Sequence, residues 1–194
     1  ITDPGSPLMH LAVQRHFLDC LESPPDVGGR FSVLTPFAMA PGALLGMDLA
    51  AIVHSALELS GQCKAEKTSD NPGLALGSWL AEQCLAGRDC LQLCIDEQYR
   101  SFGSWVEQLI AESTGKEGKG MLPLDGADAS APRSRVARVI LGASTNETFW
   151  QRYPESDDDG IPTWRITLEK ETDLGGEFFR WCFAVAIAGA VMQL

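Results

Sequence analysis

The chain has 194 residues, which suits one domain or parts of two. Its formal net charge of −11 argues against a nucleic-acid-binding surface, because such surfaces need clustered lysine and arginine. Hydrophobic residues make up 45% of the chain, enough for a sizeable core. A small anionic substrate is not excluded, since a single arginine in a cleft can act locally against the net field.

Six cysteines are scattered through apolar segments, and no two of them are spaced C-x-x-C. This usage is typical of reduced core thiols in a cytoplasmic protein. Cys90 and Cys94 fall four residues apart in a predicted strand and therefore point to one face. Because no histidine is near them in the sequence, we expect no zinc site and no other metal.

Both ends of the chain look cut, since it begins at Ile1 and ends in the apolar run "FAVAIAGAVMQL" (183–194). At about twelve residues, this run is too short to span a bilayer. We expect it to form a buried helix, and we expect no membrane partner. No signal peptide is visible.

The first half of the chain predicts several helices and one strand. Ser6 and Pro7 are typical of the N-cap and first turn of a helix over 6–15. The segment 16–21 predicts a short strand. Residues 32–46 are apolar nearly all round and predict a buried helix, broken or kinked at Pro41. Asp48 begins a further helix over 48–63.

The second half alternates helices with strands. Asn71 caps a helix over 72–87, and Asp173 caps the final helix. Strands are predicted at 89–95, 135–142 and 163–169, and a helix begins at residue 101. Residues 121–134 are expected to be irregular, and 154–162 to form an exposed acidic turn. The alternation indicates an α/β fold with parallel strands and crossover helices.

The helix from 102 to 113 combines a core stripe with a polar pair. Its apolar stripe consists of Phe102, Trp105, Val106, Leu109 and Ile110. Gln108 and Glu112, four residues apart, share a face beside that stripe. Glu112 lies near the carbonyl end of the helix, which repels a carboxylate and raises its proton affinity, as suits a general base. Taken alone, this motif favours the alternative of a solvated glutamate.

The stretch "PPDVGGRFSVLTP" (24–36) places Arg30 directly after two glycines. Gly28 and Gly29 would let the backbone bend and let a ligand approach closely, with Arg30 aimed as a fixed cation. A structural salt bridge beneath the loop is the alternative, and from this segment alone the two interpretations are equal.

Together these two segments resemble the phosphoglucose isomerase family, of the sugar isomerase (SIS) fold group. "DVGGRFSVLTPFA" (26–38) is similar to its Gly-Gly-Arg signature, and "QLIAESTGKEGKG" (108–120) to its Q-x-x-x-E-S-x-G-K segment. "FGSWVEQLIAESTGKEGKG" (102–120) and "GEFFRW" (176–181) look most like the isomerase part of bifunctional transaldolase/glucose-6-phosphate isomerases. The resemblance covers most of the chain.

The resemblance implies an incomplete three-layer α/β/α SIS-type (flavodoxin-like or Rossmann-like) parallel sheet. Residues 1–60 would be the end of the first SIS subdomain and the linker helices, and 61–194 the second SIS subdomain, truncated before its C-terminal segment. The missing parts of the chain itself, and a homo-oligomer, are the expected protein partners.

The resemblance also implies an aldose–ketose isomerase of glucose 6-phosphate and fructose 6-phosphate, without cofactor or metal. Glu112 would be the base, Arg30 would stabilise the enediolate, and Gln108, Gly28 and Gly29 would contact the sugar phosphate substrate.

Three family features have no match: a Ser/Thr-rich phosphate loop, a late lysine and a ring-opening histidine. The only histidines are His10, His16 and His54, all before the Glu112 motif. We therefore expect this chain to be inactive alone. Two other hypotheses remain, a non-catalytic sugar-phosphate-binding SIS module and a structural or oligomerising fragment.

Overall fold

In the part of the chain that the structure describes, the fold is built on one sheet of four parallel strands. The computed structural model describes residues 1–116, 118–126, 130–154 and 159–194. The strand order is β2-β1-β3-β4, and all three pairings are parallel. The strands are β1 (Cys90–Ile95), β2 (Leu122–Asp125), β3 (Val136–Ala143) and β4 (Thr163–Leu168).

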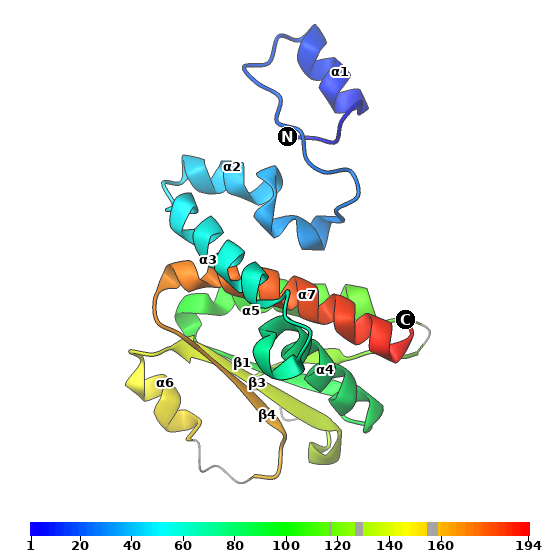
Figure 1. Ribbon diagram of the computed structural model, residues 1–194, viewed down its shortest axis with the longest axis vertical. Coiled ribbons are helices and arrows are strands. Elements are labelled where there is room, and N and C mark those ends of the chain that lie inside the picture. Colours follow the sequence, from blue (N-terminus) through cyan, green and yellow to red (C-terminus); the bar gives the residue numbers. More distant parts are fainter. Residues whose placement is uncertain (117, 127–129, 155–158) are drawn as a thin grey trace.

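The helices cover the sheet unequally, as Figure 1 shows: α4, α5 and α7 lie on one face, α3 lies beyond α7, and the short α6 lies on the other face. The segment with α1 and α2 extends away from the sheet. The α-helices are α1 (Pro7–Gln14), α2 (Pro36–Leu44), α3 (Leu49–Gln62), α4 (Pro72–Leu85), α5 (Arg100–Thr114), α6 (Glu147–Arg152) and α7 (Leu174–Met192).

The strand order confirms the predicted α/β fold class with an incomplete sheet. The order 2-1-3-4 reproduces four of the five strands of the flavodoxin-like order 2-1-3-4-5. The chain runs outward in opposite directions from β1 and from β3, so right-handed crossovers place α5 and α6 on opposite faces. Three of the four predicted strands, those at 89–95, 135–142 and 163–169, are confirmed to within one residue at each end.

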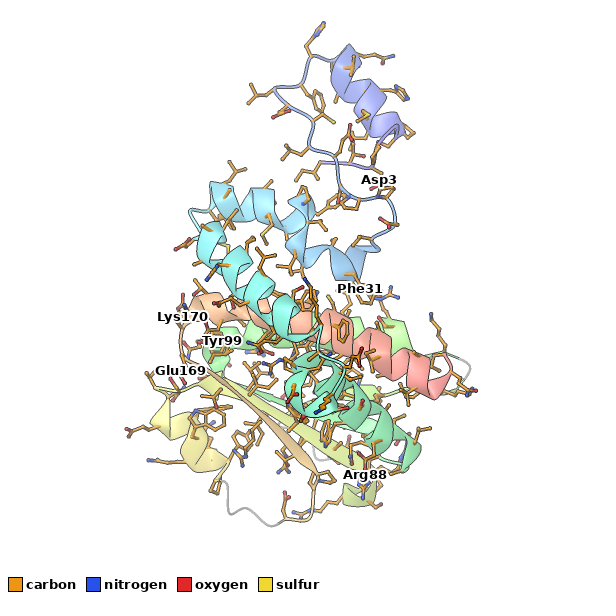
Figure 2. The ribbon with its side chains drawn as sticks, viewed as in Figure 1. Asp3, Phe31, Arg88, Tyr99, Glu169 and Lys170 are labelled. Atoms are coloured by element: carbon orange, nitrogen blue, oxygen red, sulfur yellow. The ribbon has the colours of Figure 1, made fainter. Side chains whose placement is uncertain are left out.

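The N-caps predicted from sequence are largely confirmed. The side chains of Ser6, Asp48 and Asn71 each accept a hydrogen bond from a backbone N–H in the first turn of the helix that follows. Asp173 does precede α7, but its carboxylate instead accepts from the backbone N–H groups of Glu169 and Lys170. These last two residues are labelled at the turn into α7 in Figure 2.

Four predictions about local structure were wrong. Residues 16–21 form no strand, because the chain turns at His16, whose φ is +52°. Residues 32–46 are interrupted at Thr35 rather than at Pro41: a 3-10 helix covers Gly29–Leu34, and α2 begins at Pro36 and continues through Pro41. In α2 only Gly42 is buried, so the expected burial of this helix was also wrong. The strand β2 was missed because proline breaks its apolar pattern, although proline is compatible with an edge strand.

The helix α7 is the central helix of the fold. Trp181, Ala184, Val185 and Ala188 are buried in the core. Gly77 lets α4 approach it closely, since a Cβ at this position would lie 2.6 Å from the carbonyl oxygen of Ala184. Gly175 likewise lets α7 approach α3 closely, since a Cβ there would overlap the carbonyl of Ile52.

The segment Glu171–Met192 is long and apolar enough to cross a membrane by length and composition, with a mean hydropathy of 1.4. This segment has 22 residues, whereas the apolar run considered in the sequence covers only about twelve residues at its end. Its length therefore gives no argument against a membrane-spanning helix. In this structure the segment packs against α4 and α3, and 39% of its most apolar window is buried.

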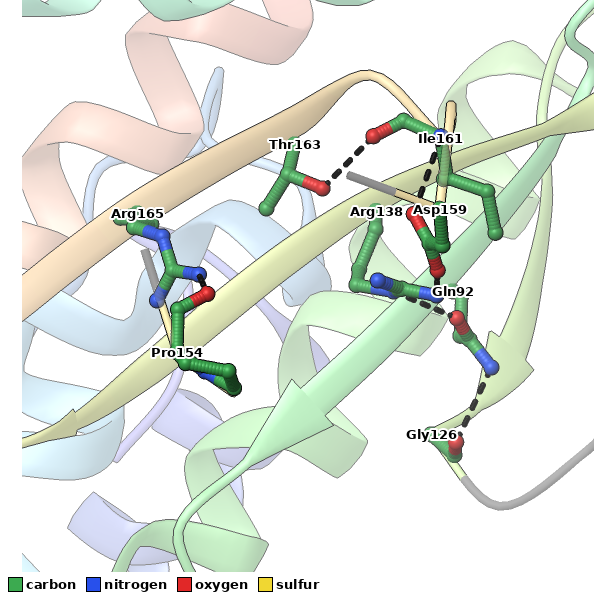
Figure 3. A network of polar contacts seen from close by, with 8 residues as sticks. All are labelled: Gln92, Gly126, Arg138, Pro154, Asp159, Ile161, Thr163 and Arg165. Atoms are coloured by element: carbon green, nitrogen blue, oxygen red, sulfur yellow. Dashed lines mark hydrogen bonds and ion pairs between the residues drawn. The ribbon is translucent and has the colours of Figure 1, made fainter. Parts of the chain in front are cut away.

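The polar side chains under the sheet form a structural network, shown in Figure 3. Arg138 on β3 donates from Nε to the Gln92 side chain at 2.9 Å and from Nη2 to Asp159 at 2.8 Å. Burial alone would raise the pKa of Asp159, but hydrogen bonds from Arg138 and from the backbone of Ile161 bring that pKa below its ordinary value. Arg165 separately donates to the carbonyl of Pro154 at 2.8 Å. These contacts tie β1, β3 and the chain before β4 together.

Replacing Gly175 by alanine is expected to destabilise the fold by about 1–3 kcal/mol, because the new Cβ would overlap the carbonyl of Ile52 on α3. Urea unfolding followed by circular dichroism measures this. Gly189→Ala, in the same helix, is the control: its Cβ meets nothing within 4 Å. That change should leave stability equal or higher by about 0.5 kcal/mol. Equal stability of the two variants would contradict the close packing of α7 on α3.

A pH dependence follows from Glu177, which is buried in α7 beside Arg180. Burial raises its pKa from 4.5 to about 7, although the Arg180 guanidinium opposes the shift. The folded state therefore binds the proton more tightly than the unfolded state. Wild-type protein should lose stability relative to Glu177→Gln as pH rises from about 4.5 to about 7. A stability difference that stays constant across this range in urea titrations would contradict the assignment.

Candidate functional site

The helix α5 carries the predicted polar pair on a well-anchored stripe. Phe102, Val106, Leu109 and Ile110 are buried, as the sequence predicted. Trp105 is partly buried and packs edge-on against Phe178 of α7, with ring centroids 5.0 Å apart. The last turns of α5, with Gln108 and Glu112, are therefore held by the core while their polar side chains face outward.

The 3-10 helix Gly29–Leu34 brings Arg30 to this helix. Phe31, labelled in Figure 2, packs against the core and fixes the segment. The indole N–H of Trp105 donates to the carbonyl oxygen of Arg30 at 3.0 Å. Arg30 therefore starts from a backbone position that is itself bonded to α5.

The guanidinium of Arg30 meets the end of α5 at two residues. Its Nη1 lies 3.2 Å from Oε2 of Glu112, and its Nε donates to Oγ of Ser113 at 2.8 Å. The two charged residues are 82 positions apart in the sequence, and the structure brings their tips into contact.

Gln108 completes this group of side chains. Its Nε2 donates to Oε1 of Glu112 at 2.9 Å, so each carboxylate oxygen of Glu112 accepts one hydrogen bond. From the sequence, only the carbonyl end of α5 was expected beside Glu112. The structure adds a guanidinium and a side-chain amide in contact with its carboxylate.

Gly28 and Gly29 lie just before Arg30. The prediction that the backbone bends here in a way that only glycine allows was wrong. Gly28 has φ −63° and ψ 154°, which any residue adopts, and Gly29 begins the 3-10 helix without a positive φ. A Cβ on either would meet nothing within 4 Å. Nothing in the described chain therefore needs glycine here, and their predicted contact with substrate stays a prediction.

The group formed by Arg30, Gln108 and Glu112 is accessible from solvent. The side chain of Glu112 is 51% exposed and that of Arg30 is 27% exposed. A cavity of about 500 Å³ lies elsewhere, at the carboxyl ends of β1 and β2 beside the first half of α5. Its lining includes Glu97, Arg100 and Glu107 but neither Arg30 nor Glu112. We place the candidate site at the accessible ion pair, because complementary chemical groups converge there.

Two contacts of this site were missed by sequence reasoning. Trp105 was assigned to the apolar stripe alone, although its indole N–H is bonded to Arg30. Ser113 belongs to the Q-x-x-x-E-S-x-G-K segment without a role predicted from sequence, yet its Oγ accepts a hydrogen bond from Nε of Arg30. Helical spacing could have placed Ser113 beside Glu112, but the contact with Arg30 depends on tertiary structure.

Other candidate groups lie outside this site. All six cysteines lie in the described part of the chain, and none of them forms a disulfide there. Burial raises the pKa of the buried Cys94 thiol and raises that of the half-buried Cys182 to about 12, so both thiols stay protonated near neutral pH. His54 on α3 is exposed and pairs with Glu58, and His10 lies in α1, away from the sheet. Among the described residues, no group of three or more His, Cys, Asp or Glu side chains is arranged to hold a metal.

Comparison with curated proteins finds glucose-6-phosphate isomerases from several organisms. The probable enzyme of Haloarcula marismortui is 31% identical over 180 residues, covering 90% of this chain and 41% of the relative. The enzyme of Methanocaldococcus jannaschii is 30% identical over 166 residues, covering 85% and 38%, respectively. The enzyme of Rubrobacter xylanophilus is 32% identical over 144 residues, which cover 73% of this chain and 33% of that enzyme.

This chain thus spans about a third to two fifths of the length of these relatives. The expected resemblance to the phosphoglucose isomerase family is confirmed over most of the chain, as is the expectation that it corresponds to only part of such a protein. No family model matches the chain.

The fold also matches a solved structure. A hypothetical protein from Thermus thermophilus superimposes with a TM-score of 0.80 at 19% sequence identity. The match covers 100% of this chain and 57% of that protein. At this identity the match supports the fold alone.

The exposed ion pair itself should add little to stability. We expect Glu112→Gln to change the free energy of unfolding by less than about 1 kcal/mol, because a half-exposed pair loses most of its attraction to solvent screening. Urea unfolding of this variant beside the wild type measures the change. A loss of several kcal/mol would indicate that the pair is a structural element rather than a functional site.

Proposed function

We propose that this chain, similar over most of its length to glucose-6-phosphate isomerases, carries the base and the cation for interconverting glucose 6-phosphate and fructose 6-phosphate. The observation that carries the proposal is the 3.2 Å contact between Nη1 of Arg30 and Oε2 of Glu112. A carboxylate and a guanidinium from distant motifs thus meet at a solvent-accessible position.

In the proposed reaction, Glu112 removes the proton from C2 of the open-chain aldose and returns it to C1. The proton of the C2 hydroxyl passes to the C1 oxygen, so the sugar phosphate keeps its composition and the carboxylate ends the cycle as it began. The proposal invokes no cofactor and no metal. The exposed fraction of 51% at Glu112 leaves room for a carbon acid to approach. A carboxylate within hydrogen-bond reach of the proton it moves is the basic requirement of such catalysis.

Arg30 has the complementary task. Removal of the C2 proton leaves negative charge on the enediolate oxygens, and a fixed cation nearby stabilises that charge without having to reorganise. Gln108 holds the second oxygen of Glu112 and so orients the carboxylate. In this proposal it also contacts the substrate, as do Gly28 and Gly29.

The remaining requirements belong to the larger protein. Phosphate binding and ring opening would come from other parts of the complete enzyme, so the 194-residue chain is expected to be inactive alone. The division into an end of a first SIS subdomain (1–60) and a second subdomain (61–194), a cytoplasmic location, a fused transaldolase and a homo-oligomer all stay parts of this proposal.

The test uses the protein that carries this chain together with its flanking segments. Glu112→Gln removes the base with little change of shape, and isomerase turnover should fall about 10²–10⁴-fold. A coupled assay that follows conversion of fructose 6-phosphate to glucose 6-phosphate measures it. Glu107→Gln is the control, because Glu107 is an exposed carboxylate on the same helix; it should keep full turnover.

Turnover that survives Glu112→Gln would rule out Glu112 as the base. The alternative, a sugar-phosphate-binding module without catalysis, has its own outcome: fructose 6-phosphate binding by calorimetry, with no turnover in the wild-type protein.

A further inference from the structure

We infer that Ser113 is a positioning residue that fixes how the guanidinium of Arg30 faces Glu112. The inference rests on the proposed function and extends it to a residue that the proposed reaction does not use. Its basis is the 2.8 Å hydrogen bond from Nε of Arg30 to Oγ of Ser113, next to the 3.2 Å contact from Nη1 to Glu112.

Arg30 is held at both ends along the last turns of α5. Its carbonyl accepts from the indole N–H of Trp105, and its Nε donates to Ser113. These two helix residues are eight positions apart, or about 12 Å along the axis at 1.5 Å per residue. The side chain therefore runs beside the helix from one fixed point to another.

The bond to Ser113 determines which donors of Arg30 remain. A guanidinium has five N–H donors. Ser113 takes the single Nε donor, and Glu112 takes one from Nη1. Within the residues that the structure describes, no hydrogen bond is recorded from Nη2. The Nη2 edge is thus left for an oxygen of the substrate.

The same bond prevents an unproductive arrangement. Arginine and carboxylate prefer a bidentate pair with two parallel N–H···O bonds. With Nε already bonded to Ser113, Arg30 cannot form the side-on pair that uses Nε and Nη2 together on Glu112. The observed contact is a single one from Nη1, so the carboxylate keeps lone pairs for the substrate proton and the cation keeps donors for the enediolate.

Ser113 is itself held in place by its neighbour. Thr114 donates from Oγ1 to the carbonyl of Ile110 at 2.9 Å, and the same oxygen accepts from the N–H of Met121 at 3.0 Å. This buried hydroxyl fixes the end of α5. Ser113 therefore presents its own hydroxyl from a backbone that cannot easily shift.

The experiment compares three variants in the protein that carries this chain with its flanks. Ser113→Ala should lower kcat roughly 10- to 100-fold, because displaced catalytic groups cost that much, and should change KM by no more than about twofold. Ser113→Thr keeps a hydroxyl and should restore most of kcat. The control Ser104→Ala removes an exposed hydroxyl of the same helix and should keep wild-type kcat. Among the described residues, this hydroxyl bonds to the carbonyl of Arg100.

A second readout is independent of turnover. The Nε proton of Arg30 can be followed by ¹⁵N NMR, and its exchange with solvent should be slow in the wild type and at least several-fold faster in Ser113→Ala. Wild-type kcat in Ser113→Ala, or an unchanged exchange rate, would overturn the inference while leaving the proposed function intact. A wild-type protein without turnover would instead overturn the proposed function, and the role of Ser113 with it.

Discussion

The contact between Arg30 and Glu112 depends on how tightly α5 is seated in the core. Only because Phe102, Val106 and Leu109 are buried does the end of α5 have a fixed position for its polar side chains. Close packing of α7 against α3 and α4, permitted by glycine at the contacts, fixes the aromatic surface on which Trp105 rests. The packing of apolar helices thus sets the geometry of an exposed ion pair.

The site differs from a structural salt bridge in its surroundings. A single 3.2 Å contact to a half-exposed carboxylate adds little to the stability of the fold. Three polar residues, Arg30, Gln108 and Ser113, are nevertheless arranged beside Glu112. Gln108 and Ser113 each bond to one member of the pair and restrict how the two can approach. This arrangement keeps a base and a cation adjacent without letting them neutralise each other fully.

Sequence patterns predicted most of the fold, because the relevant signals are local. Ser6, Asp48 and Asn71 mark helix starts through caps that involve only neighbouring residues, and apolar runs identify three of the four strands. The edge strand β2 was missed because Pro123 interrupts its pattern, and 16–21 was mistaken for a strand although it has no strand partner. Both errors concern pairing, which depends on tertiary structure.

For the site, spacing along α5 was enough to place Gln108 beside Glu112, but not to find the partners of Arg30. The contacts to Ser113 and Trp105 cross more than 70 residues of sequence and arise from packing of the linker on α5. The expectation that Gly28 and Gly29 bend the chain failed because their backbone angles are ordinary. Family resemblance indicated which residues matter, whereas the coordinates indicate how they are held.

The most direct measurement follows solvent deuterium into the sugar. The protein that carries this chain with its flanks is incubated with fructose 6-phosphate in D₂O, and the C1 and C2 protons are observed by NMR. If the carboxylate of Glu112 moves the proton, deuterium should enter at these carbons with the wild type and fail to enter when that carboxylate is replaced by an amide. Undiminished incorporation with the amide would contradict the account.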